Sequence, residues 1–184
     1  MRELSLHILD LVQNSISAGA SIMEISVNEN VIENIMSFSI RDNGKGMSRE
    51  LLNDVTDPFV TTRTTRKVGM GISLTKAGCE ACDGEFHIES TVGVGTFLSA
   101  SYRYNHIDRQ PLGDIAETVS SLILLNPHLD FIYTHIYNNE SFCLDTREVR
   151  QTIGEIPIET PEVISFIKGF IEENITVLQN KNYN

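Results

Sequence analysis

Residues 41–47 of this 184-residue chain read Arg-Asp-Asn-Gly-Lys-Gly-Met and directly follow a segment with a strand-like pattern. Residues 35–40 alternate apolar and polar side chains, which is typical of a half-buried β-strand. Asp42 is therefore expected at the end of a sheet. Gly44 and Gly46 lack a Cβ atom, so they can take positive φ and let the backbone approach a flat ligand such as a base. An ordinary polar turn would use the same residue types, so the choice between a turn and a ligand-binding loop depends on the neighbouring segments.

Length and composition indicate one globular domain, or one domain with an appendage. The chain is 41% hydrophobic, and no apolar run approaches the roughly 18 residues of a membrane span, so no membrane segment is expected. The net charge of −11, with neither half basic, disfavours direct binding of nucleic acid. Three cysteines and an N-terminus unlike a signal peptide favour a cytoplasmic protein.

Residues 3–18 have the apolar spacing of an amphipathic helix that ends at Gly19. A second, polar stripe recurs at three- and four-residue steps and comprises His7, Asp10, Gln13, Asn14 and Ser17. Solvated helix faces usually carry many Lys, Glu and Arg side chains, whereas this stripe is mainly amide and hydroxyl. It is therefore either an ordinary solvated face or the polar wall of a site.

The following segments predict a β-hairpin, a cationic loop, a helix and a second hairpin. Residues 21–28 pair with the strand that ends at Asp42, and Ser48 caps a short helix through Val55. Residues 57–71 then gather Thr, Arg and Lys, and they lead into a helical pattern over 72–82. A cationic loop before a glycine-started helix is an anion site in one interpretation and a solvated loop in the other. Residues 85–90 and 96–104 form the last two strands, with a hairpin link between them.

Two familiar phosphate-binding motifs are absent, and the two elements of a zinc-binding motif occur in the wrong order along the chain. No G-x-x-x-x-G-K-[ST] or G-x-G-x-x-G pattern occurs. The sequences His87-Ile88-Glu89 and Cys79-Glu80-Ala81-Cys82 have the elements of a deaminase signature in reversed order, so the cysteines are expected in the helix core.

Residues 105–184 carry no motif that indicates chemistry. Their pattern predicts a helix over 111–125, strands over 129–137 and 141–144, and a final helix from Thr160 to a frayed tail at 179–184. We expect a small, acidic, αββα-like appendage to a first domain of residues 1–104. It either binds a partner or a second copy of the chain, or simply packs against the first part.

The segments outlined above resemble the GHKL ATPases, the superfamily of gyrase, heat-shock chaperone, histidine kinase and MutL-type ATP sites. Residues 9–20 look like the N box, RDNGKGM resembles the first glycine box, and DPFVTTR with GMGISL resembles the F box and second glycine box. GVGTF at 93–97 is similar to the final glycine-threonine box. The resemblance implies an α/β two-layer sandwich, with a mixed, mostly antiparallel sheet and helices on one face.

The resemblance also implies ATP and Mg²⁺ as cofactors and assigns residues to them. Asn14 matches the magnesium ligand, Asp42 matches the acceptor of the adenine amino group, and Thr96 matches a residue near the base. The remaining cofactor-binding positions that it implies are Gly44, Gly46, Met47, Thr62, Arg63, Arg66, Lys67, Gly69, Met70 and Gly71.

Asp10 is where the chain departs from the family pattern. MutL-type and chaperone members have Glu there as the base that orients water, and histidine kinases commonly have Asn. Asp is one methylene shorter than Glu, and a misplacement of about 1 Å can cost on the order of a hundredfold in rate. Asp10 is therefore either the catalytic base of a slow reaction or a group that contacts the waters of the magnesium ion. No phosphoacceptor domain precedes the N box, so we expect a stand-alone ATP-binding domain rather than a complete histidine kinase.

Three functions follow from these features. The first is a regulatory module with slow or incidental hydrolysis. In it, Mg-ATP orders the cationic loop of residues 57–71, which would form a lid over the site, and changes a surface for a protein partner. The second is a protein serine kinase similar to the anti-sigma regulators. The third is a true ATPase with Asp10 as its base.

Overall fold

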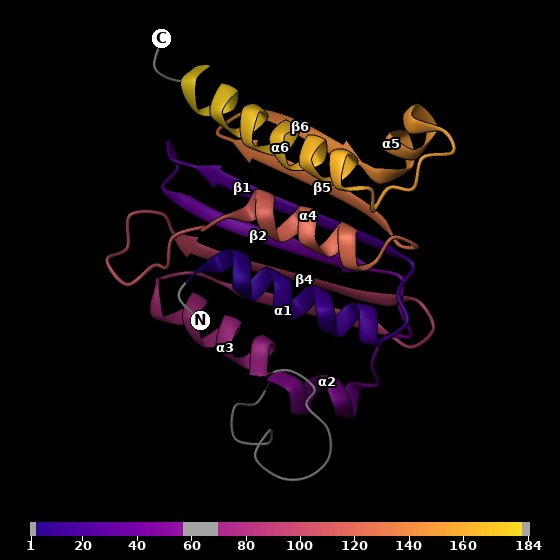
Figure 1. Ribbon diagram of the computed structural model, residues 1–184. Coiled ribbons are helices and arrows are strands. Elements are labelled where there is room, and N and C mark those ends of the chain that lie inside the picture. Colours follow the sequence, from indigo (N-terminus) through magenta and orange to yellow (C-terminus); the bar gives the residue numbers. More distant parts are fainter. Residues whose placement is uncertain (1–2, 57–69, 182–184) are drawn as a thin grey trace.

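The computed structural model describes residues 3–56 and 70–181 and shows a single sheet with helices over one face (Figure 1). Within these residues the sheet has the strand order β3-β4-β2-β1-β5-β6. The strands are β1 (Ile22–Asn30), β2 (Ile35–Asp42), β3 (Phe86–Thr91), β4 (Gly95–Arg103), β5 (Asp130–Tyr137) and β6 (Glu140–Asp145). The helices are α1 (Leu4–Ser17), α2 (Arg49–Thr56), α3 (Met70–Ala81), α4 (Ile115–Leu125), α5 (Thr146–Ile153) and α6 (Pro161–Lys181).

The strand pairing confirms the predicted mixed, mostly antiparallel sheet. Strands β1 and β2 form the expected hairpin, β2 pairs with β4, and β3 with β4, all antiparallel. Strand β5 joins β1 in the parallel sense, and β6 closes that side of the sheet as an antiparallel edge strand. The predicted α/β two-layer sandwich is therefore the observed fold.

The helical layer follows the sheet in the order α3, α1, α4, α6, with neighbouring helices in contact (Figure 1). Every second residue of the central strands is buried beneath it, as in Met23, Ile25 and Val27 of β1. Helix α1 buries Leu4, Ile8, Leu11 and Val12 on this face. The period-two and helical patterns of the sequence thus meet in one core.

The segment after residue 104 extends the same sheet and the same core. Strand β5 lies beside β1, and α4 packs between α1 and α6. Helix α4 begins at Ile115 rather than at 111, because Asp114 caps it and the carbonyls of Pro111 and Leu112 bond instead to the first turn of α1. Helix α6 continues through Lys181. Residues 179–181 are therefore helical, and the prediction that they are frayed is wrong.

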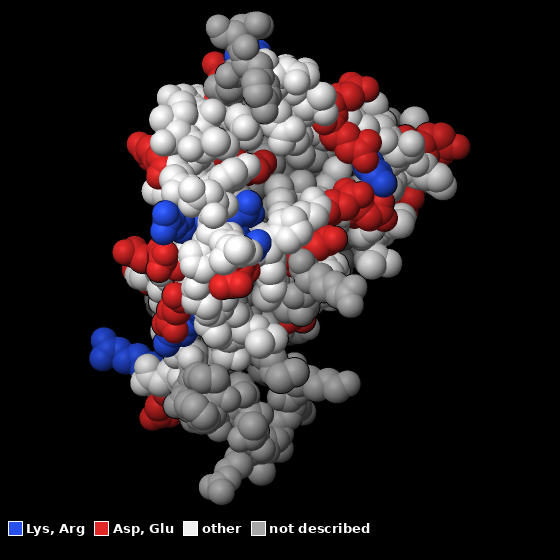
Figure 2. All heavy atoms as spheres, turned by 90° about the vertical axis from the view of Figure 1, so that its left-hand side faces the viewer, with Lys and Arg blue, Asp and Glu red and all other residues white. Residues whose placement is uncertain are grey.

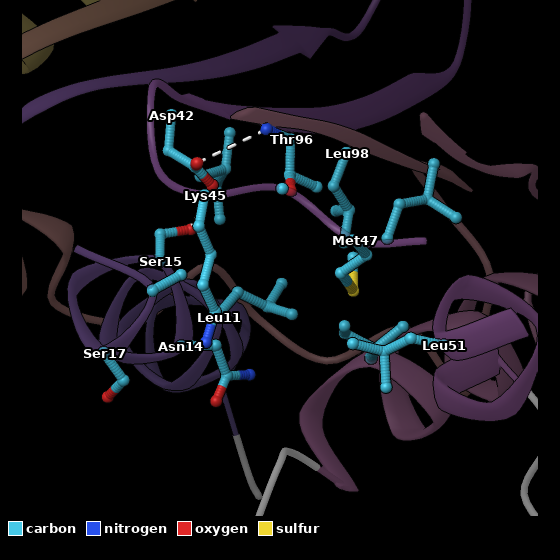
Figure 3. A pocket seen from close by; sticks show the side chains of 15 residues that line it. Leu11, Asn14, Ser15, Ser17, Asp42, Lys45, Met47, Leu51, Thr96 and Leu98 are labelled. Carbon is cyan, nitrogen blue, oxygen red and sulfur yellow. Dashed lines mark hydrogen bonds between the residues drawn. The ribbon is translucent and has the colours of Figure 1, made fainter. Parts of the chain in front are cut away.

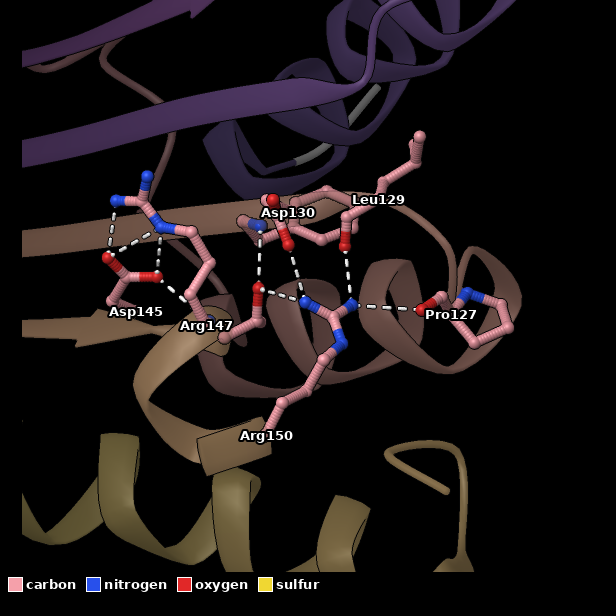
Figure 4. A network of polar contacts seen from close by, with 8 residues as sticks. Pro127, Leu129, Asp130, Asp145, Arg147 and Arg150 are labelled. Atoms are coloured by element: carbon pink, nitrogen blue, oxygen red, sulfur yellow. Dashed lines mark hydrogen bonds and ion pairs between the residues drawn. The ribbon is translucent and has the colours of Figure 1, made fainter. Parts of the chain in front are cut away.

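Helix α5 is an element that the sequence-based prediction did not include. Asp145 caps it, and Arg150 fastens it to the connection between α4 and β5 (Figure 4). The guanidinium group of Arg150 donates to the Asp130 carboxylate and to the carbonyls of Pro127 and Leu129. These bonds hold the start of β5, and hence its register beside β1. Across residues 3–56 and 70–181, no helix is both long and apolar enough to cross a membrane.

Candidate functional site

A cavity of about 180 Å³ lies between α1 and the end of the sheet where β2 stops (Figure 3). It is lined by Leu11, Asn14, Ser15, Ser17, Ala18, Ile40, Asp42, Lys45, Gly46, Met47, Leu51, Ile72, Ile88, Thr96 and Leu98. This volume is below the roughly 300–1,000 Å³ that is usual for drug-sized ligands. It suits a planar ring whose substituents extend out of the opening.

The Asp42 carboxylate is held rigidly at one end of this cavity. Its Oδ1 accepts from the backbone N–H of Gly44 at 2.8 Å and of Thr96 at 3.3 Å. Its Oδ2 accepts from the Ser15 hydroxyl at 2.6 Å. The side chain is 8% exposed, so it is fixed and nearly dehydrated. An oxygen that already accepts one bond can accept another, and Oδ2 thus remains an acceptor for a ligand N–H.

The loop after Asp42 is anchored to its surroundings by its own polar groups. Asn43 Oδ1 accepts from the backbone N–H groups of Ser21 and Ile22, at 2.8 and 2.9 Å. The N–H of Lys45 donates to the carbonyl of Ala18, and the carbonyl of Lys45 accepts from Gly93. The loop is thereby tied to α1, β1 and the second hairpin.

The two glycines of the loop differ in backbone conformation, and only Gly46 takes the positive φ that the sequence suggested. Gly46 has φ +65°, and a Cβ there would overlap the carbonyl of Thr91. Gly44 is not among the residues with positive φ, and a Cβ there would lie 3.1 Å from both the Ala18 carbonyl and Asp42 Oδ1. Gly46 is therefore required for the loop to pack closely against the protein, whereas a Cβ at Gly44 would need its neighbours to shift.

The second hairpin supplies the opposite wall. Gly95 has φ +133° and lies against the carbonyl of Asp42, where a Cβ would overlap. Thr96 follows with its N–H on Asp42, and its hydroxyl lies 2.8 Å from the Ser90 hydroxyl. Ser90 in turn accepts from the N–H of Met47 at 2.8 Å. Thr96, which was predicted near the base, and Met47, which was predicted to contact the cofactor, thus line the same cavity as Asp42.

Asn14 lies on α1, on the side of the cavity away from the β2 end, and its amide is unsatisfied. Its Nδ2 is buried without a hydrogen-bond partner among the described residues. Buried amides are normally paired, so an unpaired one facing a cavity indicates that a ligand completes its bonding. Lys45 extends across the opening towards this part of α1 (Figure 3).

Asp10 lies one turn before Asn14 and does not line the cavity. Instead its carboxylate lies against Gly71, in the first turn of α3. His7, a further turn back, is buried beside the same helix, with Nδ1 3.4 Å from the Thr75 hydroxyl. Burial lowers the pKa of His7. The predicted polar stripe is therefore divided between α3 and the cavity, and Gln13 is left exposed to solvent.

Several predicted site residues lie outside the described residues. These are Thr62, Arg63, Arg66, Lys67 and Gly69, together with the side chain of Met70. Their contacts with phosphate remain predictions.

Two functional residues were missed from the sequence. Ser15 supplies a hydrogen bond to Asp42, and Lys45 lines the opening. Ser15 directly follows Asn14, and Lys45 lies inside the glycine loop itself. Their positions within the motifs could therefore have identified both residues from the sequence.

The site combines the fixed carboxylate of Asp42 with an apolar cavity beneath α1, the first helix over a mixed sheet. This arrangement is that of a nucleotide-binding domain of the GHKL type. Residues 2–105 match the model of the family described as histidine kinase-, DNA gyrase B-, and HSP90-like ATPase. This match covers more than half of the 184 residues. The chain belongs to this family and contains its ATP-binding domain.

Individual relatives match about half of the chain. A protein described as a sensor protein from Shewanella frigidimarina is 36% identical over 91 residues, which are 48% of this chain and 14% of the relative. The non-motile and phage-resistance protein of Caulobacter vibrioides is 29% identical over 112 residues, which are 56% of this chain and 13% of the relative. This chain thus spans a small part of each of these relatives.

The fold extends to more distant proteins. The N-terminal domain of a DNA repair protein superposes with a TM-score of 0.55 at 14% identity, over 86% of this chain and 59% of that one. That likeness concerns the fold alone.

Proposed function

We propose that this protein is a regulatory module that binds Mg-ATP and presents a different surface to a protein partner when it does, with slow or incidental hydrolysis. The observation that carries the proposal is the rigid Asp42 acceptor at the end of an apolar cavity. The nucleotide would be recognised there without rearrangement of the base end.

The cavity walls support an adenine ring. Leu11, Ile40 and Leu98 provide apolar surface for the faces of a ring, and Asp42 Oδ2 can accept from an exocyclic amino group. A guanine ring has a carbonyl at the equivalent position, which would meet the carboxylate oxygen. Discrimination between the two bases would therefore depend on Asp42.

Asn14 supports a magnesium site of the kind that takes most of its ligands from phosphate and water. The amide oxygen of Asn14 is a suitable hard ligand for Mg²⁺. The amide nitrogen is buried without a hydrogen-bond partner within the described residues, and as a donor it would serve a phosphate oxygen instead of the metal. No group of three His, Cys, Asp or Glu residues in the described chain forms a metal site of its own. Mg²⁺ would neutralise phosphate charge, and Asn14 would fix its position.

Nucleotide binding can be transmitted through α3. Ile72 lines the cavity, Gly71 lies against Asp10, and α3 also contacts α2. Residues 57–69, the predicted cationic lid, connect α2 to α3. A nucleotide that engages the lid would bias both helices and the surface that they form.

The position of Asp10 supports slow turnover. Its carboxylate packs on the backbone of Gly71 instead of projecting into the cavity, and it is shorter than the Glu of hydrolytic relatives. A true ATPase is the second candidate, because Asp10 is still one turn from Asn14. The anti-sigma-like serine kinase and the homodimer remain predictions that transfer of labelled phosphate and sedimentation would test.

The experiment is a comparison of binding with turnover. Titration calorimetry with Mg-ATP should show a single site, whereas phosphate release by the purified chain should remain slow and fall little in Asp10→Ala. Rapid release that Asp10→Ala abolishes would instead establish the ATPase. Absence of any nucleotide binding by the folded chain would reject both candidates.

A further inference from the structure

Helix α6 has one side that the rest of the described chain leaves uncovered. Residues at three- and four-residue steps share this side, and we call them the α6 stripe: Glu162, Phe166, Gly169, Glu173 and Val177. The opposite side of the helix is buried in the core through Val163, Ile167, Ile171 and Leu178. The stripe is about 22 Å long, at 1.5 Å per helical residue.

Phe166 is the most prominent member of the stripe and is 65% exposed. Its ring centroid lies 6.3 Å from that of Phe170, which lies 5.9 Å from that of Phe142 on the edge strand β6. An aromatic row therefore leads from the core to the surface of α6. Exposed aromatic side chains supported in this way are typical anchors of protein interfaces.

Gly169 is the second observation that indicates contact with another chain. It lies in the interior of α6, where glycine weakens a helix relative to alanine. A Cβ at this position would have no atom within 4 Å, so no contact within the described chain requires glycine there. A bare backbone beside Phe166 is explained if another chain packs closely against it.

The charges on the stripe decide which kind of chain this is. Glu162 and Glu173 form no ion pair within the described residues, whereas both lysines of α6 are already paired, Lys168 with Glu117 and Lys181 with Glu140. Residues 105–184 carry 12 acidic and 5 basic side chains. Acidic side chains also predominate over basic ones on the face shown in Figure 2. If the stripes of two copies packed together, their glutamates would meet, and neither lysine of the described helix α6 is unpaired to offset that repulsion.

We infer that the α6 stripe docks an amphipathic helix of a partner protein, with a small residue against Gly169, apolar side chains on Phe166 and Phe170, and Lys or Arg beside Glu162 and Glu173. This inference goes beyond the proposed function, since α4 separates α6 from the helix that lines the nucleotide cavity. Docking therefore does not require the nucleotide site.

The test uses a labelled helical peptide with Leu and Ala on one face and Lys on the other, and a control peptide in which Glu replaces every Lys. Fluorescence anisotropy with the full chain should show binding of the Lys peptide at least about tenfold tighter than of the Glu peptide. Added salt should weaken the binding of the Lys peptide.

Three variants locate the interaction. Phe166→Ser should weaken binding of the Lys peptide about tenfold or more, as expected for an aromatic anchor. Ile32→Ser removes a side chain that is 74% exposed on the β1–β2 turn, and it should leave binding unchanged. Gly169→Ala should raise the melting temperature and yet weaken binding, a combination that a purely structural role does not produce. The melting shift caused by Mg-ATP should persist in all three, which separates failure of this inference from failure of the nucleotide site.

Equal binding of the two peptides, or full binding by Phe166→Ser, would overturn the inference. Sedimentation of the unmodified chain as a dimer that Phe166→Ser dissociates would also overturn it, because the occupant would then be a second copy.

Discussion

The Asp10 carboxylate occupies the space that a side chain at Gly71 would need, so that the first turn of α3 rests on the helix that carries Asn14. A Cβ at Gly71 would overlap Asp10 Oδ2, and even the Asp10 Cγ would be only 3.1 Å away. The position of the candidate catalytic carboxylate and the position of α3 are therefore coupled.

Gly71→Ala tests this coupling. In the parent chain we expect a loss of about 1 kcal/mol, because the Asp10 side chain must leave its preferred rotamer. In an Asp10→Ala background the same change should be neutral or stabilising, since the overlap is gone and alanine favours the helix. Urea denaturation of the four variants gives the coupling energy, and strict additivity would contradict the packing of Asp10 on Gly71.

Gly95 and Gly93 form a matched pair for the contact between the second hairpin and Asp42. Both have positive φ, at +133° and +78°, but only a Cβ at Gly95 meets other atoms, at the Asp42 carbonyl. Gly93→Ala should cost about 1–2 kcal/mol from backbone strain alone. Gly95→Ala should cost about 2–5 kcal/mol, because overpacking adds to the strain. Equal losses in denaturation midpoint would show that Gly95 does not support Asp42.

His7 should make stability depend on pH. Burial lowers its pKa below the usual 6.5, so the unfolded chain binds a proton that the folded chain does not. Its contribution to stability is therefore complete above about pH 6.5 and is lost as the pH falls below that value. His7→Gln should flatten this part of the curve of unfolding free energy against pH. Curves of the same shape for His7→Gln and the parent would contradict the burial of His7.

The three cysteines should react at different rates. Burial raises the pKa of Cys79 to about 11 and also raises that of Cys82, whereas Cys143 is exposed on β6. A thiol reagent at neutral pH should modify Cys143 rapidly and the other two only on unfolding. Cys143→Ser should remove the fast phase. A second fast thiol in that variant would show that the end of α3 is open.

The sequence allowed much of the site to be predicted because its motifs are local. Asp42 ends a strand and precedes a glycine loop, and both features can be recognised within a few residues. Ser15 was missed because its role depends on a contact between α1 and β2, which no local pattern encodes. Gly44 and Gly46 were singled out from the sequence, but the constraint that the structure shows on them is packing against Ala18 and Thr91, which are distant in sequence.

The second half of the chain was harder to predict for the same reason. The strand pattern of residues 129–137 was recognised, but its parallel pairing with β1 depends on tertiary contacts. Helix α5 was missed because its sequence is mostly polar. A signal was present, since Asp145 followed by Glu148 has the spacing of a helix N-terminus, and Gly154 ends the helix with φ +65°.

The central claim is that Asp42 selects adenine nucleotides, and calorimetric titration of the parent chain and Asp42→Asn with Mg-ATP and Mg-GTP tests it most directly. We expect Mg-ATP to bind the parent chain with clear preference over Mg-GTP. Asp42→Asn should weaken Mg-ATP by about 1.5–3 kcal/mol, or about 10–100-fold, because a hydrogen bond to a charged acceptor is lost, and it should reduce the preference. Ser15→Ala, which removes only the support of Oδ2, should have a smaller effect. Equal affinity of the parent chain for both nucleotides, or unchanged preference in Asp42→Asn, would contradict the account.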